Sequence, residues 1–174
     1  HGIVLTASYP AKRMGVKTGM PIWEAKQHCR DLIIVPASYG KYQKYSGYVR
    51  EVFNDYTDQV ESFGLYEAWL DITGSVGLFG SPVKIAKEIS VRIKRELGIT
   101  VSIGVSFNKI TAKLGSDYKK PDAITVIEPD TYKQIVYPLP VGDLLYVGNA
   151  TQRKLGSYGI RTIGQLAETN PEVL

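Results

Sequence analysis

The stretch Val60–Thr73, V-E-S-F-G-L-Y-E-A-W-L-D-I-T, is the part of the chain from which the fold can be worked out. Apolar residues lead into and out of a polar elbow at Tyr66–Glu67, and beyond it they recur at every second position, the period of a half-buried strand. We therefore predict a hairpin of two short strands, with Glu67 exposed yet rigidly held. On this stretch alone, Glu67 is either a metal ligand or, as most acidic turn residues are, merely solvated.

The composition indicates one globular domain, or one domain with small attachments. The chain has 174 residues, of which 44% are hydrophobic and 22% are charged, as is typical of globular proteins. Its net charge of +4 fits an anionic partner, although many proteins without one are as basic. The single Cys29 excludes an internal disulfide, and one cysteine with two histidines excludes a zinc cluster.

The same features predict where the protein resides. No apolar run approaches the roughly 20 residues of a membrane span, and the start of the chain lacks the basic region of a signal peptide. We therefore expect a cytoplasmic protein with no membrane partner. The chain begins at His1 rather than at methionine, so we also expect a fragment whose upstream part is missing.

The first 38 residues are rich in glycine, proline and other breakers, which predicts an appendage rather than an independent core. Gly2–Ala7 is expected to form a short strand and Ile22–Cys29 a helix. Next, apolar residues at three- and four-residue spacing predict a helix over Ser38–Tyr56. Its Tyr45 and Tyr48 are interpreted as core residues rather than as platforms for stacked bases.

The clearest helix of the chain is predicted over Ser81–Leu97, with Ser81 as its N-cap, Pro82 in its first turn and Gly98 at its end. An inward-facing apolar stripe at helical spacing supports it. That stripe consists of Ile85, Ile89, Ile93 and Leu97.

Two more strands, Ile99–Val105 and Ala123–Ile127, flank a short helix capped by Asn108, in which Ile110 and Leu114 should face inward. The order from residue 38 is thus helix, strand, strand, helix, strand, helix, strand. The class is α+β, and one more strand at the start would complete β-α-β-β-α-β, the ferredoxin-like arrangement. That strand should pair beside the hairpin, and no segment of this chain is a convincing candidate for it.

Charged residues are segregated along the chain. Between Glu51 and Asp71 there are six carboxylates and no lysine or arginine, whereas Lys109–Lys120 contains four lysines and one aspartate. An acidic pole and a basic pole would suit a metal-assisted reaction on a phosphate substrate, because carboxylates hold divalent cations and lysines hold phosphate oxygens. The alternative is a pair of solvated faces.

The segment that follows residue 143 is similar to a helix-hairpin-helix, whose glycine turn presents backbone N–H groups to a DNA phosphate. The usual turn is Gly, apolar, Gly, but here Tyr146 stands at the first glycine position and only Gly148 remains. We expect one helix over Thr151–Tyr158 and a second after Thr162. The alternative is an ordinary helical hairpin.

Three motifs resemble those of the Y-family (DinB-like, translesion) DNA polymerases, in the order of that family. S-Y-P-A-K-R-M-G-V-K-T-G-M-P (Ser8–Pro21) resembles the fingers motif S-Y-E-A-R-x-x-G-V-x-x-G-M-P. Val60–Ser75 resembles the palm motif that contains S-x-D-E-A-x-L-D, and Gly104–Pro121 resembles G-I-S-x-N-K-x-x-A-K-x-A-S-D-x-x-K-P. The resemblance runs from about Ile3 to Leu166.

The resemblance implies an incomplete ferredoxin-like polymerase palm over residues 39–127. Part of the fingers would occupy residues 1–38, and the start of a helix-hairpin-helix thumb residues 128–174. Such an enzyme synthesises DNA past damaged bases, in DNA repair and the SOS response, and uses two Mg²⁺ ions. Its partners are primer-template DNA and deoxynucleoside triphosphates, and a sliding clamp would bind through regions outside this chain.

The resemblance also implies roles for single residues. Tyr9, Lys12 and Lys120 would contact the incoming triphosphate, and Lys12 keeps the charge but not the bidentate fork of the usual arginine. Glu67 would be a carboxylate of the metal site, beside Tyr66 at the position of the usual aspartate. The residues that would hold DNA are Lys109, Lys113, Gly148 and Thr151.

The departures from the family pattern concern the metal site. The family uses three carboxylates, of which the first, on a strand near the N-terminus, has no counterpart here, and the second is replaced by Tyr66. A tyrosine, with a pKa of about 10, is neutral at pH 7 and a poor Mg²⁺ ligand. Asp71 does not substitute, because four strand residues of about 3.3 Å each put it ~13 Å from Glu67, whereas paired ions lie roughly 3.5–4 Å apart.

We therefore expect that this chain alone does not extend a primer, although it should bind DNA weakly and in a salt-sensitive way. Two other classes stay open. A non-catalytic relative that binds DNA or nucleotide is favoured by Tyr66 and Tyr146. Another palm-type nucleotidyl enzyme, such as a cyclase, is disfavoured by the thumb-like segment after Asp143.

Overall fold

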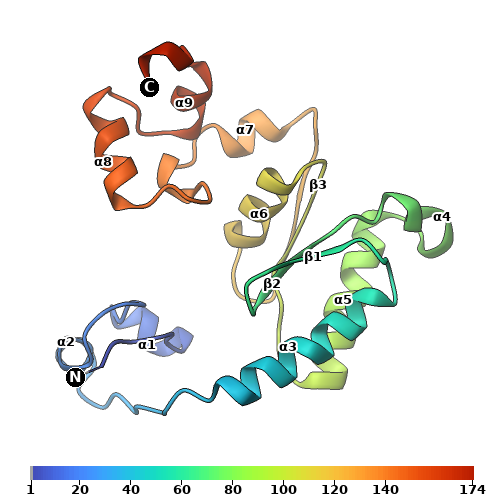
Figure 1. The fold of residues 1–174 in the computed structure, drawn as a ribbon, viewed down its shortest axis with the longest axis horizontal. Helices are drawn as coiled ribbons and strands as arrows, with labels where there is room; N and C mark the ends of the chain where they lie inside the picture. Colours follow the sequence, from blue (N-terminus) through green and yellow to red (C-terminus); the bar gives the residue numbers. More distant parts are fainter. Residues whose placement is uncertain (1) are drawn as a thin grey trace. The chain divides into compact units, whose positions relative to one another are not determined.

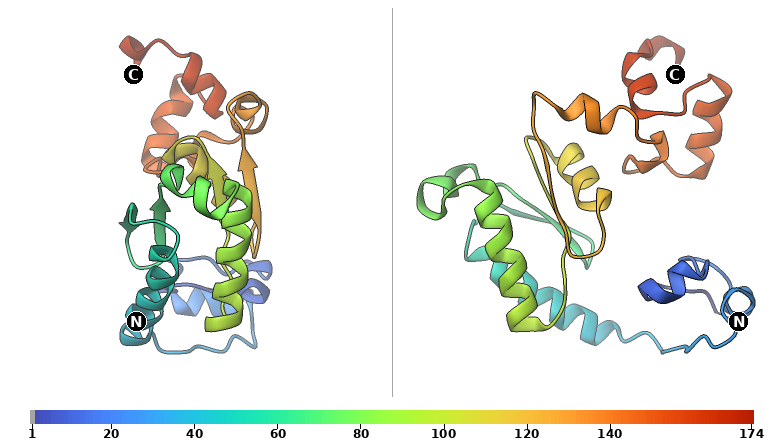
Figure 2. Two further views of the ribbon diagram at one scale, coloured as in Figure 1. Left: turned by 90° about the vertical axis from the view of Figure 1, so that its right-hand side faces the viewer. Right: turned by 180° about the vertical axis from the view of Figure 1, so that it is seen from behind.

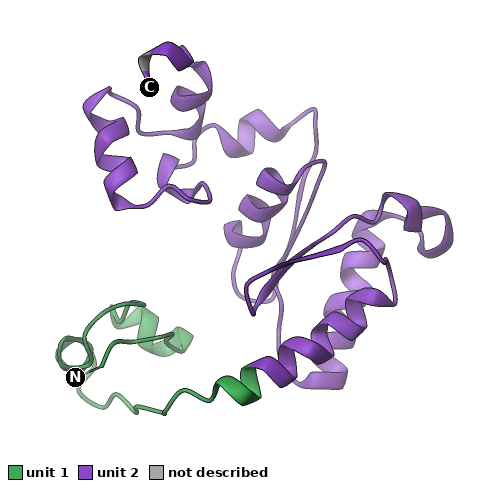
Figure 3. Ribbon diagram, in the orientation of Figure 1, with its two compact units in different colours: residues 1–42 green, residues 43–174 purple. Residues whose placement is uncertain are grey.

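The computed structural model describes residues 2–174. The chain divides into two compact units, with the boundary between residues 42 and 43 (Figure 3). The predicted divisions at residues 38 and 127 stay predictions. None of the described helices is long and apolar enough to cross a membrane.

The first unit contains the helices α1 (Tyr9–Arg13) and α2 (Ile22–His28) (Figure 1). The prediction for α2 is confirmed to within one residue, whereas α1 was not predicted. The hydroxyl of Ser8 caps α1 by accepting a hydrogen bond from the backbone N–H of Ala11 at 3.4 Å. The buried residues of this unit form a small core of their own, which consists of Val4, Ala11, Val16 and Ala25.

The strand predicted over Gly2–Ala7 is wrong. Ile3 forms only an isolated bridge with Pro21, although Val4 donates to the carbonyl of Met20 and accepts from the N–H of Gly19, both at 2.8 Å. The partner segment is short, because a turn at residues 18–19 precedes it and α2 begins at Ile22, whose N–H donates to the carbonyl of Gly2 at 3.0 Å. The pairing therefore stops after one bridge.

The helix predicted over Ser38–Tyr56 is confirmed as α3 (Tyr39–Asn54). The assignment of its tyrosines to the core is wrong, because Tyr45 is 43% exposed and Tyr48 is 37% exposed. Their rings contact each other edge to face, with centroids 6.1 Å apart. The apolar stripe does continue along α3, but only its second half, from Val49 onward, packs against the core of the second unit.

The predicted hairpin is confirmed, with β1 (Val60–Phe63) antiparallel to β2 (Glu67–Leu70). Its turn ends one residue earlier than expected and occupies residues 64–66, where Gly64 has a φ of +65° that favours glycine. Glu67 is therefore the first residue of β2. A short 3₁₀ turn (Thr73–Ser75) and α4 (Val76–Phe79) follow the hairpin.

The helix α5 (Pro82–Leu97) forms as predicted. The hydroxyl of Ser81 accepts from the backbone N–H of Lys84 at 3.3 Å, and Gly98 ends the helix in the left-handed conformation with a φ of +67°. Its apolar stripe lies beside the second half of α3 in the main core (Figures 1 and 2). The buried members of that core are Val52, Tyr56, Ile85, Ile89 and Ile93.

Next come β3 (Ile103–Ser106), α6 (Lys109–Tyr118) and β4 (Ile124–Ile127), in which the two strands pair in parallel and α6 packs on them. The strand predicted from Ile99 begins only at Ile103. Asn108 is the expected N-cap of α6 and accepts from the backbone N–H of Thr111 at 2.9 Å. The predicted order of helices and strands is thus confirmed, with α4 and the 3₁₀ turn as additions.

Leu114 on α6 is buried as predicted, but the prediction that Ile110 faces inward is wrong, since Ile110 is 62% exposed. The backbones of α6 and β3 approach so closely that a Cβ on Gly115 would lie 3.2 Å from the Cα of Gly104. This contact turns Thr111 and Gly115 toward the strands, and Ile110 is rotated outward.

Within residues 2–174, the hairpin and the β3–β4 pair remain two separate two-stranded sheets. The strand that a complete ferredoxin-like order requires beside the hairpin is not found among these residues. The small sheets fit the incomplete palm that the sequence predicts.

The C-terminal segment is helical, as expected. It contains α7 (Tyr132–Val136), a 3₁₀ turn (Val141–Asp143), α8 (Asn149–Ser157), α9 (Ile163–Glu168) and a last 3₁₀ turn (Pro171–Val173). The helix predicted from Thr151 begins two residues earlier, at Asn149. Thr162 and Gln165 form a capping box that opens α9, which explains why the second helix follows Thr162.

Candidate nucleotide and DNA site

One face of the hairpin lies against α6. The indole Nε1 of Trp69 donates a hydrogen bond to the backbone carbonyl of Lys109 at 3.1 Å. The ammonium of Lys109 forms an ion pair with Glu61 and lies 5.6 Å from the centroid of the Trp69 ring. The acidic and basic segments are therefore paired with each other across the hairpin and α6, rather than forming two separate poles.

A second set of ion pairs extends from Glu67. The ammonium of Lys113 lies 3.1 Å from Oε1 of Glu67 and 2.7 Å from Oδ2 of Asp117. Lys120, just after α6, lies 2.5 Å from Oδ1 of the same Asp117. We call these four side chains the charge network; it joins the predicted metal-site carboxylate to a predicted triphosphate-binding lysine.

The charge network shifts the pKa values of its central pair. Burial of the Lys113 ammonium disfavours its charge, but hydrogen bonds to Asp117 and Glu67 outweigh that cost and raise the pKa of Lys113. Burial likewise disfavours the charge of Asp117, and hydrogen bonds from Lys113 and Lys120 outweigh it and lower the pKa of Asp117. Both groups are therefore charged at neutral pH.

We expect Asp117→Asn to lower the unfolding free energy by about 1 kcal/mol at pH 7, since the ion pairs of Asp117 are partly screened by solvent. A carboxyl whose pKa is lowered by folding stabilises the protein above its unfolded pKa, about 3.9, and loses this contribution as the pH falls through the folded value. The difference between wild type and variant should therefore shrink below about pH 4.

Urea denaturation between pH 7 and pH 3.5 measures this difference. Asp130→Asn is the control, because Asp130 is an exposed carboxylate outside the charge network; it should change stability by less than about 0.5 kcal/mol. A difference for Asp117→Asn that is the same at both ends of the pH range would contradict the assignment.

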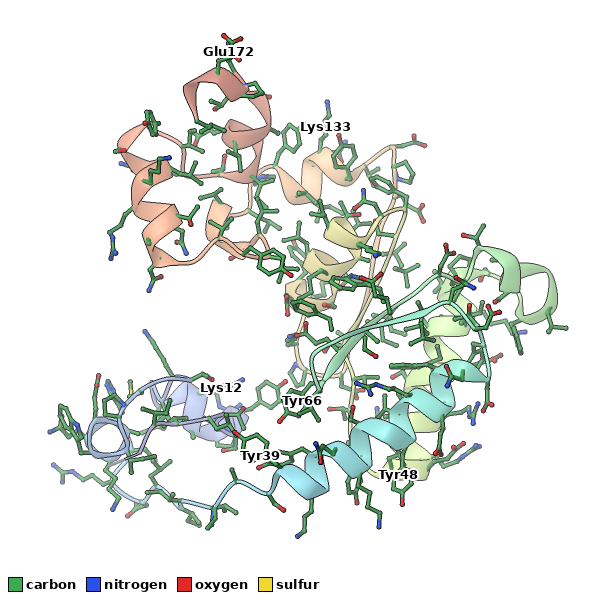
Figure 4. All side chains as sticks on the ribbon, viewed as in Figure 1. Lys12, Tyr39, Tyr48, Tyr66, Lys133 and Glu172 are labelled. Carbon is green, nitrogen blue, oxygen red and sulfur yellow. The ribbon has the colours of Figure 1, made fainter. Side chains whose placement is uncertain are left out.

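The donors around Glu67 do not complete a two-ion Mg²⁺ centre. Among residues 2–174, no three His, Cys, Asp or Glu side chains gather where they could hold a metal ion. Tyr66 lies at the turn of the hairpin, 69% exposed (Figure 4). Asp71 accepts a hydrogen bond from the backbone N–H of Thr73 at 2.9 Å, and hydrogen bonding by Thr73 lowers the pKa of Asp71. Asp71 thus caps the turn after β2.

The other predicted triphosphate contacts belong to the first unit. Tyr9 is the first residue of α1 and is 43% exposed. The ammonium of Lys12, one turn later, lies 5.3 Å from the centroid of the Tyr9 ring. The fingers-type motif therefore brings these two side chains together on one short helix.

The turn before α8 supports the comparison with a helix-hairpin-helix. Tyr146 has a φ of +69°, the left-handed conformation that favours glycine, which explains why the usual motif has glycine at this position. Its ring is 82% exposed and contacts Phe63 of the hairpin edge to face, with centroids 6.3 Å apart. Gly148 is the N-cap of α8 and has no side-chain cap, and Thr151 is exposed in the first turn.

Sequence reasoning missed the roles of Asp117 and Trp69. The signal for Asp117 was its spacing, four residues after Lys113 and three before Lys120, which puts all three on one side of a helix end. The signal for Trp69 was its place between Ala68 and Leu70 in a strand, which puts its side chain on the opposite face of the hairpin from theirs. Neither pattern identified the partner.

Comparison with known proteins places these features in a family. Residues 1–117 match the impB/mucB/samB family. The chain is 55% identical over its 174 residues to DNA polymerase IV of Acetivibrio thermocellus, of which it covers 44%. It is 41% identical over 173 residues to DNA polymerase IV 1 of Bacillus subtilis, of which it covers 42%.

Solved structures show the same likeness. DinB from Sulfolobus solfataricus is 34% identical, with a TM-score of 0.87 over 97% of this chain and 50% of that one. The insertion ternary complex of Dbh DNA polymerase is also 34% identical, with a TM-score of 0.88 over 97% of this chain and 49% of that one. The chain spans about half the length of these relatives. It belongs to the impB/mucB/samB family, as the resemblance to Y-family DNA polymerases predicted.

Proposed function

We propose that this chain supplies the palm, part of the fingers and the start of the thumb of a template-directed DNA polymerase that copies damaged DNA. The observation that carries the proposal is the charge network, because it connects Glu67 to Lys120 within the two motifs shared with Y-family polymerases. Relatives named DNA polymerase IV, matched over the whole of this chain, support it.

In this proposal, the residues of the chain position the substrates for nucleotidyl transfer. Tyr9, Lys12 and Lys120 hold the triphosphate of an incoming deoxynucleotide. Gly148 and the first turn of α8, with Thr151, hold the backbone of primer-template DNA through N–H groups. Lys109 and Lys113, which are ion-paired here, would contact DNA only by exchanging those partners for phosphate.

The proposal also includes Mg²⁺, which would supply Lewis-acid chemistry at the reacting phosphate. Glu67 is one suitable carboxylate, and a two-ion site would need carboxylates beyond those that the described residues gather around it. A cytoplasmic location, a place in the SOS response and a sliding clamp bound through other regions belong to the proposal as family properties.

Primer extension by a chimera tests this function. The segment of Acetivibrio thermocellus DNA polymerase IV that matches this chain would be replaced by residues 1–174, and extension would be assayed on undamaged and abasic templates. We expect template-dependent extension on both. A chimera that folds and binds primer-template DNA but extends neither template would contradict the proposal.

That contrary result would favour the second candidate, a non-catalytic relative that binds DNA. The observation in its favour is Tyr66, which replaces a carboxylate beside Glu67. Binding and synthesis therefore have to be measured on the same chimera.

We also expect this chain to bind duplex DNA weakly, with an affinity that falls about tenfold or more between about 50 and 200 mM salt. Gly148→Ala should weaken binding about fivefold by blocking the approach of a phosphate to the turn. Folding does not require glycine here, because a Cβ at Gly148 would meet no atom within 4 Å and its φ is −78°.

Fluorescence anisotropy with a labelled duplex measures both effects. Gly156→Ala, farther along the same helix and equally free of contacts, is the control and should leave affinity unchanged. Equal affinity at low and high salt would argue against phosphate binding, and equal effects of the two alanine variants would argue against the turn.

A further inference from the structure

Asp117 holds two lysines at once in the charge network. Its Oδ2 lies 2.7 Å from Lys113 and its Oδ1 lies 2.5 Å from Lys120. The two lysines differ in access, since the side chain of Lys120 is 44% exposed and that of Lys113 only 16%. An anion from solution can therefore reach Lys120 more readily than Lys113.

Lys113 is in turn shared between two carboxylates, Asp117 at 2.7 Å and Glu67 at 3.1 Å. How strongly each carboxylate attracts Lys113 depends on how far its own charge is already neutralised. Asp117 is neutralised partly by Lys120, and this pairing leaves Lys113 available to Glu67. Removing Lys120 from Asp117 should therefore shift Lys113 toward Asp117 and away from Glu67.

We propose that Asp117 is a positioning residue through which a polyphosphate anion at Lys120 releases Glu67. When the anion pairs with Lys120, Asp117 loses that lysine and binds Lys113 more strongly. The ammonium of Lys113 then moves away from Glu67, whose carboxylate is left without its lysine partner. The inference rests on the proposed function, in which Lys120 contacts the triphosphate. It adds an order of events, in which binding of the substrate phosphate comes first and frees the carboxylate of Glu67 from its ion pair with Lys113.

The first experiment titrates this 174-residue chain with inorganic tripolyphosphate, without metal, and follows the side-chain ammonium signals of its lysines by NMR. In the wild type, the signals of Lys120 and Lys113 should move together and report the same Kd. In Asp117→Asn, the Lys120 signal should still move while the Lys113 signal stays in place.

Each outcome has a distinct meaning. If in the wild type the Lys120 signal responds and the Lys113 signal does not, the role of Asp117 is overturned while phosphate binding by Lys120 stands. If Lys113 still responds in Asp117→Asn, the anion contacts it directly and the proposal fails. If Lys120 does not respond in any form of the protein, its role in the proposed function fails, and the inference fails with it.

The second experiment uses the reciprocity of coupled equilibria. In Glu67→Gln, Lys113 pairs with Asp117 alone, and this stronger pairing weakens the hold of Asp117 on Lys120. Tripolyphosphate should therefore bind at Lys120 about fivefold more tightly than in the wild type. Glu61→Gln is the matched control, since it removes the same charge from the same hairpin face outside the charge network. Equal changes in the two variants, or a full effect of Glu67→Gln in the Asp117→Asn background, would overturn the proposal.

Discussion

Gly104→Ala is expected to lower the unfolding free energy by about 3 kcal/mol or more, at the upper end of what overpacking costs. A Cβ on Gly104 would lie 1.8 Å from the carbonyl oxygen of Ala112 and 2.6 Å from the backbone nitrogen of Ser116. Both atoms belong to the backbone of α6, so no rotation of a side chain relieves the clash. The whole helix has to move away from β3.

Urea denaturation of the two proteins measures the loss. Gly156→Ala on α8 is the control, because a Cβ there meets nothing within 4 Å and alanine favours the helix. The control should gain up to about 1 kcal/mol, the opposite sign. A Gly104→Ala protein within about 0.5 kcal/mol of wild type would show that α6 does not pack on β3 as closely as described.

The same clash should disturb the site, because α6 carries the lysines that face the hairpin. If α6 moves, Lys109 and Lys113 leave Glu61 and Glu67, and the charge network opens. Gly104 stands within the motif that resembles the polymerase pattern. Glycine is required at this position because the backbone of α6 fills the space that a side chain would occupy. The neighbouring residues in the sequence give no sign of this requirement.

The parts of the fold that the sequence predicted are those set by local rules. For the helix α5, the N-cap, the proline of the first turn, the apolar stripe and the terminal glycine all predict the same boundaries, and the helix has these boundaries in the structure. The hairpin follows from its alternating pattern, with an error of one residue at its turn. In both cases, the information lies within one short segment.

The errors arise where another segment decides the outcome. Tyr45 continues an apolar stripe, yet it is exposed because the core of the second unit begins only at Val49. Ile110 is at the right spacing from Leu114, yet the contact between Gly104 and Gly115 turns it outward. The ion pairs across the hairpin and α6 likewise join residues more than 40 positions apart, which no local pattern connects.

Tyr66→Asp in the chimera with Acetivibrio thermocellus DNA polymerase IV is expected to raise the rate of primer extension about 100-fold. A carboxylate at this position would stand beside Glu67 at the start of β2 and would supply a hard oxygen ligand that tyrosine does not offer at neutral pH. Because Tyr66 is 69% exposed, the substitution should leave folding intact. Steady-state extension on one undamaged template, with Mg²⁺ varied, measures the change.

Two variants make this result specific to the carboxylate. Tyr66→Phe removes the hydroxyl without adding an acid and should change the rate less than about threefold, whereas Glu67→Gln should lower it about 100-fold or more. If Tyr66→Asp and Tyr66→Phe behave alike, the position does not serve a metal. If the unaltered chimera already matches the parent enzyme, Glu67 and the ligands outside this chain suffice, and Tyr66 no longer favours a non-catalytic relative.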